Sequence, residues 1–389
     1  MGSKKNGDQF IMKVLFISHF KEGTAWSRAA ADYATAMASA GIEVCARNVL
    51  LQAQTIEETL LKSSSAPVPL KIQNMMSKDT KNTEACVQFV LPHLTSHTSM
   101  FKNVIITDID STKPESMTWF EHLRPADELW TVSAQAKEYF DRTSFSGKVR
   151  VVGKPFKPPK NTGEFSMPPE LESAYKFYWI GGVETRFNLA SVIKAFHSEF
   201  TSGEDVALIL KPQHDLASPE QLHQHVSSLS DQIKTALRIY PHTSLYRREA
   251  IIPEALNRQG LDALHASCDC FVYTPHADSW GGEAASALYF GNTPILSAVG
   301  GALDVAGQSE PESSRLVGGS FSPCECADAP FPRMYTGSEL WFSPDISEIR
   351  YNMRESYESR GEKPKKAQKL ENISMESIGQ NIREFLNAG

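Results

Sequence analysis

Apolar runs of strand length alternate with amphipathic helical patterns along most of this chain. Such alternation is typical of parallel β-sheets that carry helices on both faces. The pattern restarts after Pro158, so the 389 residues predict two α/β domains, each long enough to bury its own core. The predicted strands are residues 13–18, 43–49, 103–107, 128–132, 148–152, 177–181, 206–210, 270–273 and a strand from 294.

Residues 307–335 lack periodicity and predict an irregular loop, whereas helical spacing fills most of the remaining connections. The strand-like run at 12–18 argues for a first β-strand and against a signal peptide. We expect residues 1–11 to be a tag-like or disordered start. The predicted helices are residues 26–40, 115–123, 134–140, 189–200, 220–239, 253–267, a short helix ending at 290, 344–356 and 375–386.

Net charge, cysteine content and hydropathy bear on nucleic-acid binding, on the cellular compartment and on membrane insertion. A net charge of −7 argues against non-specific nucleic-acid binding by the whole surface. The six cysteines follow no disulfide framework, which predicts a reducing, cytoplasmic compartment. No apolar run reaches the roughly 18 residues that a membrane span needs, so we expect no such span.

Residues 268–296 carry the most informative motif. An apolar strand at 270–273 is followed by a glycine-containing loop at 278–282, a short helix and a second strand. In a parallel sheet such a loop lies at the carboxyl end of a buried strand and opens a helix. Its backbone amides and the positive end of the helix dipole can then hold an anion such as a phosphate. An ordinary tight turn is the alternative.

This motif resembles the donor-binding segment of retaining GT-B glycosyltransferases of the glycogen-synthase-like and mannosyltransferase-like family. Two positions depart from the family pattern, because Asp278 replaces the first of its two glutamates and Ser286 replaces the second. The positions that fit the pattern are Asp269, Pro275, Gly281, Gly291, Pro294, Ile295 and the pair Gly300-Gly301.

The resemblance implies roles for the residues of this segment. The first carboxylate, here Asp278, lies near the donor sugar, and Gly281 and Gly282 present backbone amides to the sugar or phosphate. In the family the second carboxylate holds the nucleotide ribose. Ser286 cannot accept two hydroxyl hydrogen bonds as a carboxylate does, so either Glu283 substitutes for it or donor recognition differs.

Other segments extend the likeness over nearly the whole chain, among them Ala126-Asp-Glu-Leu-Trp-Thr-Val-Ser133 and the run from Ile180 to Phe196. The implied architecture is GT-B, with two Rossmann-like parallel-sheet domains facing a cleft. Residues 12–157 would form the acceptor-side domain and 158–370 the nucleotide-sugar-binding domain. The final helix, within 371–389, would cross back to the first domain. The implied activity is transfer of a hexosyl or pentosyl group with retention of configuration.

Sugar transfer from a nucleotide diphosphate needs cations or amides facing the departing pyrophosphate, where negative charge develops. In the family an arginine and a lysine supply them without a metal or other cofactor, and the donor is UDP- or GDP-linked. Here Arg186 is followed by Phe187, where lysine is commoner, so Lys211 is the candidate for the second cation. A solvated surface lysine is the alternative. Ile252 stands where relatives sandwich the nucleotide base, although a core position explains it equally well.

Candidates for the acceptor side follow two predicted strands. Asp108 and Asp110 come after the strand at 103–107, and His19 comes after the first strand. We expect the aspartates to bind the acceptor or act as base, with helix capping as the alternative. Their Asp-x-Asp spacing also resembles the metal motif of GT-A glycosyltransferases, which leaves a metal-dependent transferase as a rival hypothesis. A structural loop histidine is the alternative for His19.

Two further alternatives concern the acceptor and the activity. The sequence leaves three acceptors open: a glycan, a small molecule, or a modified base in DNA as in phage-type DNA glycosyltransferases. The loop at 62–81 and a basic stretch are the only sequence signs of DNA, and a solvated linker also explains that stretch. The substitutions Ser286 and Phe187 leave open a degenerate protein that binds nucleotide sugars without turnover. The basic residues are Arg142, Lys148, Arg150, Lys154 and Lys157.

Overall fold

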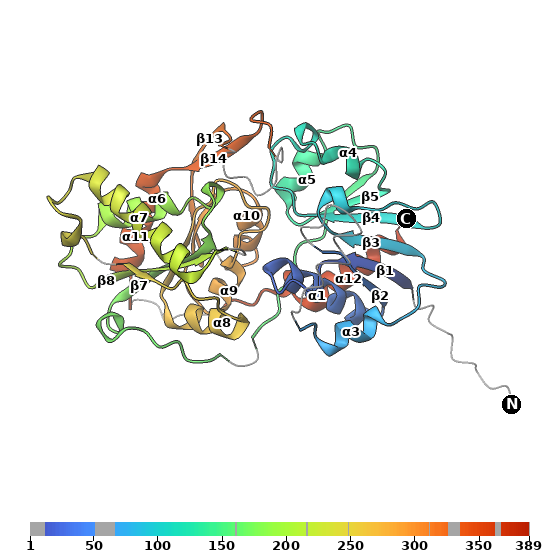
Figure 1. The fold of residues 1–389 in the computed structure, drawn as a ribbon, viewed down its shortest axis with the longest axis horizontal. Coiled ribbons are helices and arrows are strands. Elements are labelled where there is room, and N and C mark those ends of the chain that lie inside the picture. Colours follow the sequence, from blue (N-terminus) through green and yellow to red (C-terminus); the bar gives the residue numbers. More distant parts are fainter. Residues whose placement is uncertain are drawn as a thin grey trace.

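The computed structural model describes residues 12–50, 67–159, 162–214, 217–247, 249–310, 312–325, 335–361 and 367–388. The described residues form two α/β lobes that lie side by side (Figure 1). The start predicted at 1–11 lies outside the described residues, as does the 62–66 part of the loop predicted at 62–81. No helix in the described ranges combines the length and the apolar character that a membrane crossing requires.

The N-terminal domain contains a parallel sheet of six strands in the order β2-β1-β3-β4-β5-β6. Its strands are β1 (Lys13–Ser18), β2 (Glu43–Asn48), β3 (Ala85–Phe89), β4 (Lys102–Thr107), β5 (Glu128–Thr131) and β6 (Lys148–Val151). Its helices are α1 (Ala25–Ser39), α3 (Leu70–Met76), α4 (Phe120–Leu123) and α5 (Ala134–Phe140). The sequence prediction missed β3, which lies between β1 and β4, and it assigned a loop to the residues of α3.

The C-terminal domain repeats this architecture with the strand order β12-β11-β10-β7-β8-β9. Its parallel strands are β7 (Tyr175–Gly182), β8 (Val206–Gln213), β9 (Glu249–Ile251), β10 (Cys270–Tyr273), β11 (Ile295–Ser297) and β12 (Arg315–Val317). Its helices are α6 (Leu189–Glu199), α7 (Pro219–Leu237), α8 (Arg258–Ser267), α9 (Ala284–Tyr289), α10 (Gly301–Ala306) and α11 (Ile346–Glu358). An antiparallel hairpin of β13 (Gly319–Pro323) and β14 (Leu340–Pro344) is added to it.

Two predictions for this domain are wrong. The irregular loop expected at 307–335 contains β12 and β13, and the helix expected at 253–267 begins only at Arg258, after the edge strand β9. Each of these strands is only three to five residues long, and β12 and β13 also have glycine, serine or proline within or beside them, so the three strands give little periodic signal.

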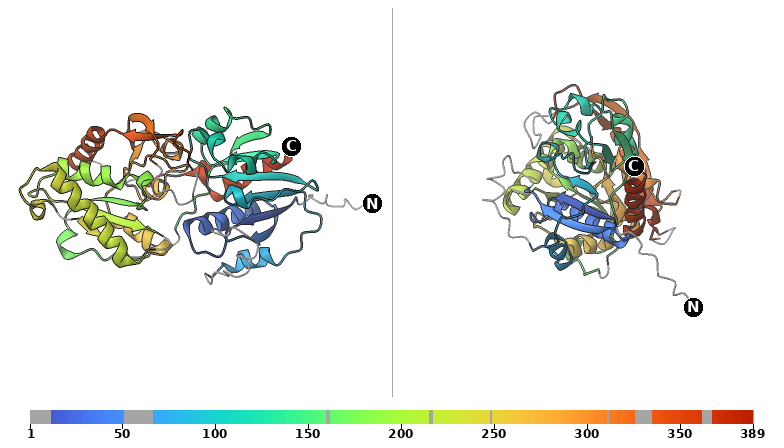
Figure 2. Two further views of the ribbon diagram at one scale, coloured as in Figure 1. Left: turned by 45° about the horizontal axis from the view of Figure 1, so that its top comes forward. Right: turned by 90° about the vertical axis from the view of Figure 1, so that its right-hand side faces the viewer.

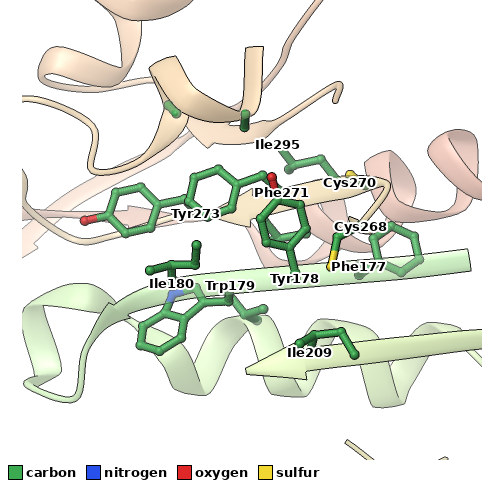
Figure 3. Close-up of a cluster of buried hydrophobic side chains, with 14 of the residues drawn as sticks. Phe177, Tyr178, Trp179, Ile180, Ile209, Cys268, Cys270, Phe271, Tyr273 and Ile295 are labelled. Atoms are coloured by element: carbon green, nitrogen blue, oxygen red, sulfur yellow. The ribbon is translucent and has the colours of Figure 1, made fainter. Parts of the chain in front are cut away.

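The core of the C-terminal domain forms around the central strands β7 and β10. Both are apolar over several consecutive residues because helices cover the two faces of a parallel sheet. Tyr178 of β7 packs against Phe271 of β10, and Phe177 lies in register with Cys270 (Figure 3); all four side chains are fully buried. Trp179 is also fully buried. This packing fixes the position at which β10 ends and the glycine-containing loop begins.

The last helix, α12 (Met375–Asn387), packs on the N-terminal domain, although α11 belongs to the C-terminal one (Figure 1). Both views in Figure 2 keep α12 beside the N-terminal lobe. Ile378 and Ile382 of α12 are buried in the same core as Val14 and Phe16 of β1. The chain therefore passes between the domains twice, once between β6 and β7 and once before α12.

Candidate functional site

The loop between β10 and α9 has a backbone conformation that favours glycine. Gly281 and Gly282 have φ angles of +101° and +56°, which lie in the left-handed region. A Cβ added at Gly281 would lie 2.9 Å from backbone atoms of Ala302 in α10. The loop therefore packs directly against α10, with no room for a side chain at Gly281.

Asp278 is fixed inside this loop. Its Oδ2 accepts hydrogen bonds from the Tyr273 hydroxyl (2.9 Å) and from the Gly281 amide (3.0 Å). Burial raises the pKa of Tyr273 far above its usual value, and the Asp278 charge adds to this, so the phenol remains a hydrogen-bond donor. Asp278 also lines a crevice between the domains, together with Asp110 and Gln135 of the N-terminal domain.

Arg186 faces the N-terminal domain from the short 3₁₀ turn Thr185–Phe187, which follows β7. Its Nη1 lies 2.7 Å from Oδ2 of Asp110, and its guanidinium lies 4.3 Å from the ring centre of Phe187. Burial alone would lower the pKa of Arg186, but the charge of Asp110 and those of the other acidic groups around it, Asp278 among them, together outweigh burial and raise the pKa. Phe187, which replaces the commoner lysine, therefore supports Arg186 through a cation–π contact.

Lys211 lies in β8 beside Ile180 of β7, near the edge from which Arg186 projects. Only 2% of the residue is exposed, so the solvated-surface alternative is wrong. Its Nζ donates to the carbonyl of Pro212 (2.7 Å), and no carboxylate of the described residues lies within ion-pair distance. Burial lowers the pKa of Lys211 to about 8, with the charge of Glu254 opposing it.

Glu283 and Ser286 begin α9 and bind to a residue that the sequence analysis missed. The Arg258 guanidinium donates to Glu283 (3.2 Å) and to the Ser286 hydroxyl (2.8 Å), and Ser286 itself donates to Glu283 (2.9 Å). Burial alone would raise the pKa of Glu283, but the neighbouring His265 and Arg258 outweigh it and the pKa is lowered. Arg258 therefore binds both of the side chains that the sequence analysis considered for the nucleotide ribose.

Asp108 is placed in the cleft, with partners from both domains. Its carboxylate accepts from Nζ of Lys154 (2.5 Å) and from the hydroxyl of Ser279 in the β10–α9 loop. Asp108 and Asp110 are thus each paired with a cation of this chain. Among the described residues, no three His, Cys, Asp or Glu side chains are grouped as a metal site.

His19 is fully buried and does not line the crevice. Its Nδ1 donates to the carbonyl of Val49 (2.6 Å), and its ring contacts the edge of Trp26. Burial lowers the pKa of His19 to about 4, against the effect of the Val49 carbonyl, so the ring is neutral at ordinary pH. This environment fits the structural-histidine alternative. Ile252 is half-buried against the core, and its amide extends the pairing of β9 with β8.

The five basic residues predicted as a possible DNA-binding stretch do not form one surface of unpaired cations. Arg150 binds Glu128 (3.1 Å) and lies over the ring of Phe385, and Lys154 binds Asp108. These two residues are therefore not free cations facing an acceptor, whereas the remaining three, Arg142, Lys148 and Lys157, are exposed.

Comparison with known proteins identifies the fold. No protein-family profile and no curated protein sequence matches the chain. HepE from Anabaena, solved with UDP and glucose, superposes with a TM-score of 0.59 at 15% identity, covering 97% of this chain and 100% of HepE. Sucrose-phosphate synthase from Thermosynechococcus elongatus gives 0.56 at 13% identity, covering 97% and 94%. A trehalose-6-phosphate structure from E. coli, bound with UDP-2-fluoro glucose, gives 0.55 at 11% identity, covering 96% and 98%. The chain therefore has the GT-B fold, in which two Rossmann-like domains face a cleft.

Proposed function

We propose that this protein is a glycosyltransferase whose C-terminal domain holds a nucleotide-sugar donor. The observation that carries the proposal is Lys211, a buried ammonium that forms no ion pair with a carboxylate of the described residues and feels only the more distant charge of Glu254. A buried charge is costly unless it is paired. The diphosphate of a nucleotide sugar supplies the missing counter-charge, and Lys211 lies on the edge of the sheet where Arg186 and the β10–α9 loop also lie.

We assign separate roles in donor binding and activation to the residues at this edge of the C-terminal sheet. Arg186 and Lys211 neutralise the charge that develops on the departing diphosphate. The Gly282 amide approaches the sugar or phosphate, whereas the Gly281 amide already donates to Asp278 and fixes its carboxylate. Asp278 is held by Tyr273 and faces the donor sugar. Arg258 fixes Ser286 and Glu283, whose polar groups we assign to the nucleotide ribose.

The finer features of the reaction belong to the same proposal. HepE is solved with UDP-glucose as well as with UDP, which makes UDP-glucose the first donor to test. Transfer with retention follows from the resemblance of residues 268–296 to the retaining family. Metal independence is supported by Asp108 and Asp110, since each already binds a cation of the chain. Nothing in the described residues favours DNA over a glycan or small-molecule acceptor.

The test is UDP-glucose turnover, measured as UDP release with and without EDTA. We expect Arg186→Ala and Lys211→Ala each to lower turnover at least about tenfold, because each removes a charged hydrogen-bond donor. The matched controls are Arg354→Ala and Lys176→Met. Arg354 also lies over a phenylalanine and binds carboxylates, and Lys176 is also a buried lysine bonded to carbonyls, yet neither lines the cleft.

Each outcome separates one rival. UDP binding by calorimetry without turnover favours the degenerate binding protein. Loss of turnover in EDTA, restored by Mn²⁺, favours the metal-dependent alternative built on Asp108 and Asp110. Inversion of the anomeric centre, seen by NMR of the product, contradicts retention. A protein that binds no UDP, UDP-glucose or GDP-linked sugar contradicts the proposal itself.

A further inference from the structure

A single carboxylate of the N-terminal domain is bound by two residues of the C-terminal domain. Oδ2 of Asp110 accepts from Nη1 of Arg186 (2.7 Å), and Oδ1 accepts from the hydroxyl of Tyr335 (2.7 Å). We call these three residues the Asp110 clamp. The side chain of Asp110 is only 4% exposed. The Asp110 clamp therefore exists only while the two domains lie together.

A chain of contacts links Tyr335 of the Asp110 clamp back to Arg186, which belongs to the same clamp. The ring of Tyr335 lies edge-on to Trp341 of β14, and Trp341 stacks on His276. The amide of His276 donates to the carbonyl of Arg186 (2.8 Å). Arg186 is thus fixed at both ends, by His276 at the backbone and by Asp110 at the guanidinium.

The Tyr335 hydroxyl determines the orientation of the Asp110 carboxylate. Burial raises the pKa of Tyr335 above its usual value, and the Asp110 charge adds to this. The hydroxyl therefore stays protonated and donates a hydrogen bond to Asp110. Without this donor, Oδ1 would lose its hydrogen bond and the carboxylate would be free to rotate about its bond to Cβ. Nη1 of Arg186 would then lose its fixed acceptor, since it is the guanidinium nitrogen that Asp110 binds.

We propose that Tyr335 is a positioning residue that acts through Asp110 to aim the Arg186 guanidinium at the donor diphosphate. This inference rests on the function proposed above. Fixed orientation of a charged donor matters most where charge develops in the transition state. Loss of the Tyr335 hydroxyl is therefore expected to lower kcat more than it raises the KM for the donor.

The first experiment is a double-mutant cycle with Tyr335→Phe and Asp110→Asn, using UDP-glucose as donor. Tyr335→Phe keeps the ring contact with Trp341 and removes only the hydroxyl. We expect it to lower kcat about tenfold, the scale of one hydrogen bond to a charged group, while KM changes less than about threefold. In the Asp110→Asn background the same substitution should have little further effect, because coupled residues are not additive.

The second experiment needs no turnover. The rate at which phenylglyoxal labels Arg186, followed by peptide mass spectrometry, should rise severalfold in Tyr335→Phe. The control is Tyr246→Phe, which removes an equally buried hydroxyl that bonds to the Lys234 carbonyl, far from the cleft. It should leave both kcat and Arg186 labelling at the parent values.

The outcomes distinguish the two proposals. Parent-like labelling of Arg186 in Tyr335→Phe overturns the positioning role, whether or not the protein turns over UDP-glucose. Full additivity in the cycle also overturns it, because Tyr335 would then act independently of Asp110. Faster labelling in a protein that binds no nucleotide sugar would support the positioning role and count against the proposed function alone.

Discussion

Replacing Lys211 with methionine should make the protein more stable and less active at once. Burial lowers the pKa of Lys211 from 10.5 to about 8. At about 1.4 kcal/mol per pKa unit, this difference means that the charged form costs the folded state about 3 kcal/mol. Methionine removes that charge and also the hydrogen bond from Nζ to Pro212, worth about 1 kcal/mol. The net gain in the free energy of unfolding is therefore about 2 kcal/mol.

The gain depends on pH in a defined direction. The folded pKa lies below the unfolded one, so the cost of the charged lysine is fully present below about pH 8. It declines as the pH rises from about 8 toward 10.5, because the parent protein then loses the proton in its folded state first. The stability difference between Lys211→Met and the parent should therefore be largest at neutral pH and fade in alkali.

The assay is urea unfolding of both proteins at neutral and at alkaline pH, with UDP-glucose turnover measured in parallel. Lys176→Met is the matched control and should gain no stability while keeping parent turnover, because Lys176 lies at the start of β7, away from the cleft. A Lys211→Met protein that is less stable than the parent at neutral pH, or that keeps parent turnover, refutes the reasoning.

The remaining predictions test other parts of the structure. Glu249→Gln leaves the buried Lys234 without its ion-pair partner (2.7 Å) and should cost about 3 kcal/mol in urea unfolding. His197 and Lys234 lower the pKa of Glu249 from 4.5 to about 2 despite burial, so this loss should shrink as pH falls from 4.5 toward 2; a pH-independent loss contradicts the ion-pair explanation. Gly282→Ala should weaken UDP binding in calorimetry, because its Cβ would lie 3.0 Å from the Tyr273 ring at a φ of +56°, whereas Gly203→Ala, whose Cβ would come no closer than 4.0 Å to Thr201, should bind as the parent does. Arg258→Met should raise the KM for UDP-glucose severalfold by releasing Ser286 and Glu283, and an unchanged KM would remove both residues from the donor site.

The sequence predicts most of the fold because strands and helices in this chain have strong local periodicity. The strand β3 was missed although its five residues are buried, since Gln88 interrupts the apolar run. The Gln88 amide is satisfied by the backbone of Ser96, which donates to Oε1 (2.9 Å) and accepts from Nε2 (2.6 Å). A polar side chain satisfied by the backbone of a loop eight positions later carries no sign of burial within the strand itself.

The candidate site was predictable only where a motif is contiguous. The β10–α9 loop and Asp278 follow from one short segment. The partners of Asp108 and Asp110 do not, because Lys154 is 46 positions from Asp108, and Arg186 is 76 positions from Asp110. Tyr335 lies 225 positions from Asp110 in a region without periodicity, so only the folded structure brings them together.

The two passages of the chain between the domains are joined where they cross. The amide of Phe156 donates to the carbonyl of Ile373 (2.7 Å), and Phe156 also forms a β-bridge with Ser374. Because both connections between the lobes are joined at this one place, we expect any opening of the cleft to pivot there. A proteolytic nick in the first passage, between residues 162 and 168, would accordingly yield two fragments that stay together as one particle, because α12 remains anchored in the N-terminal core.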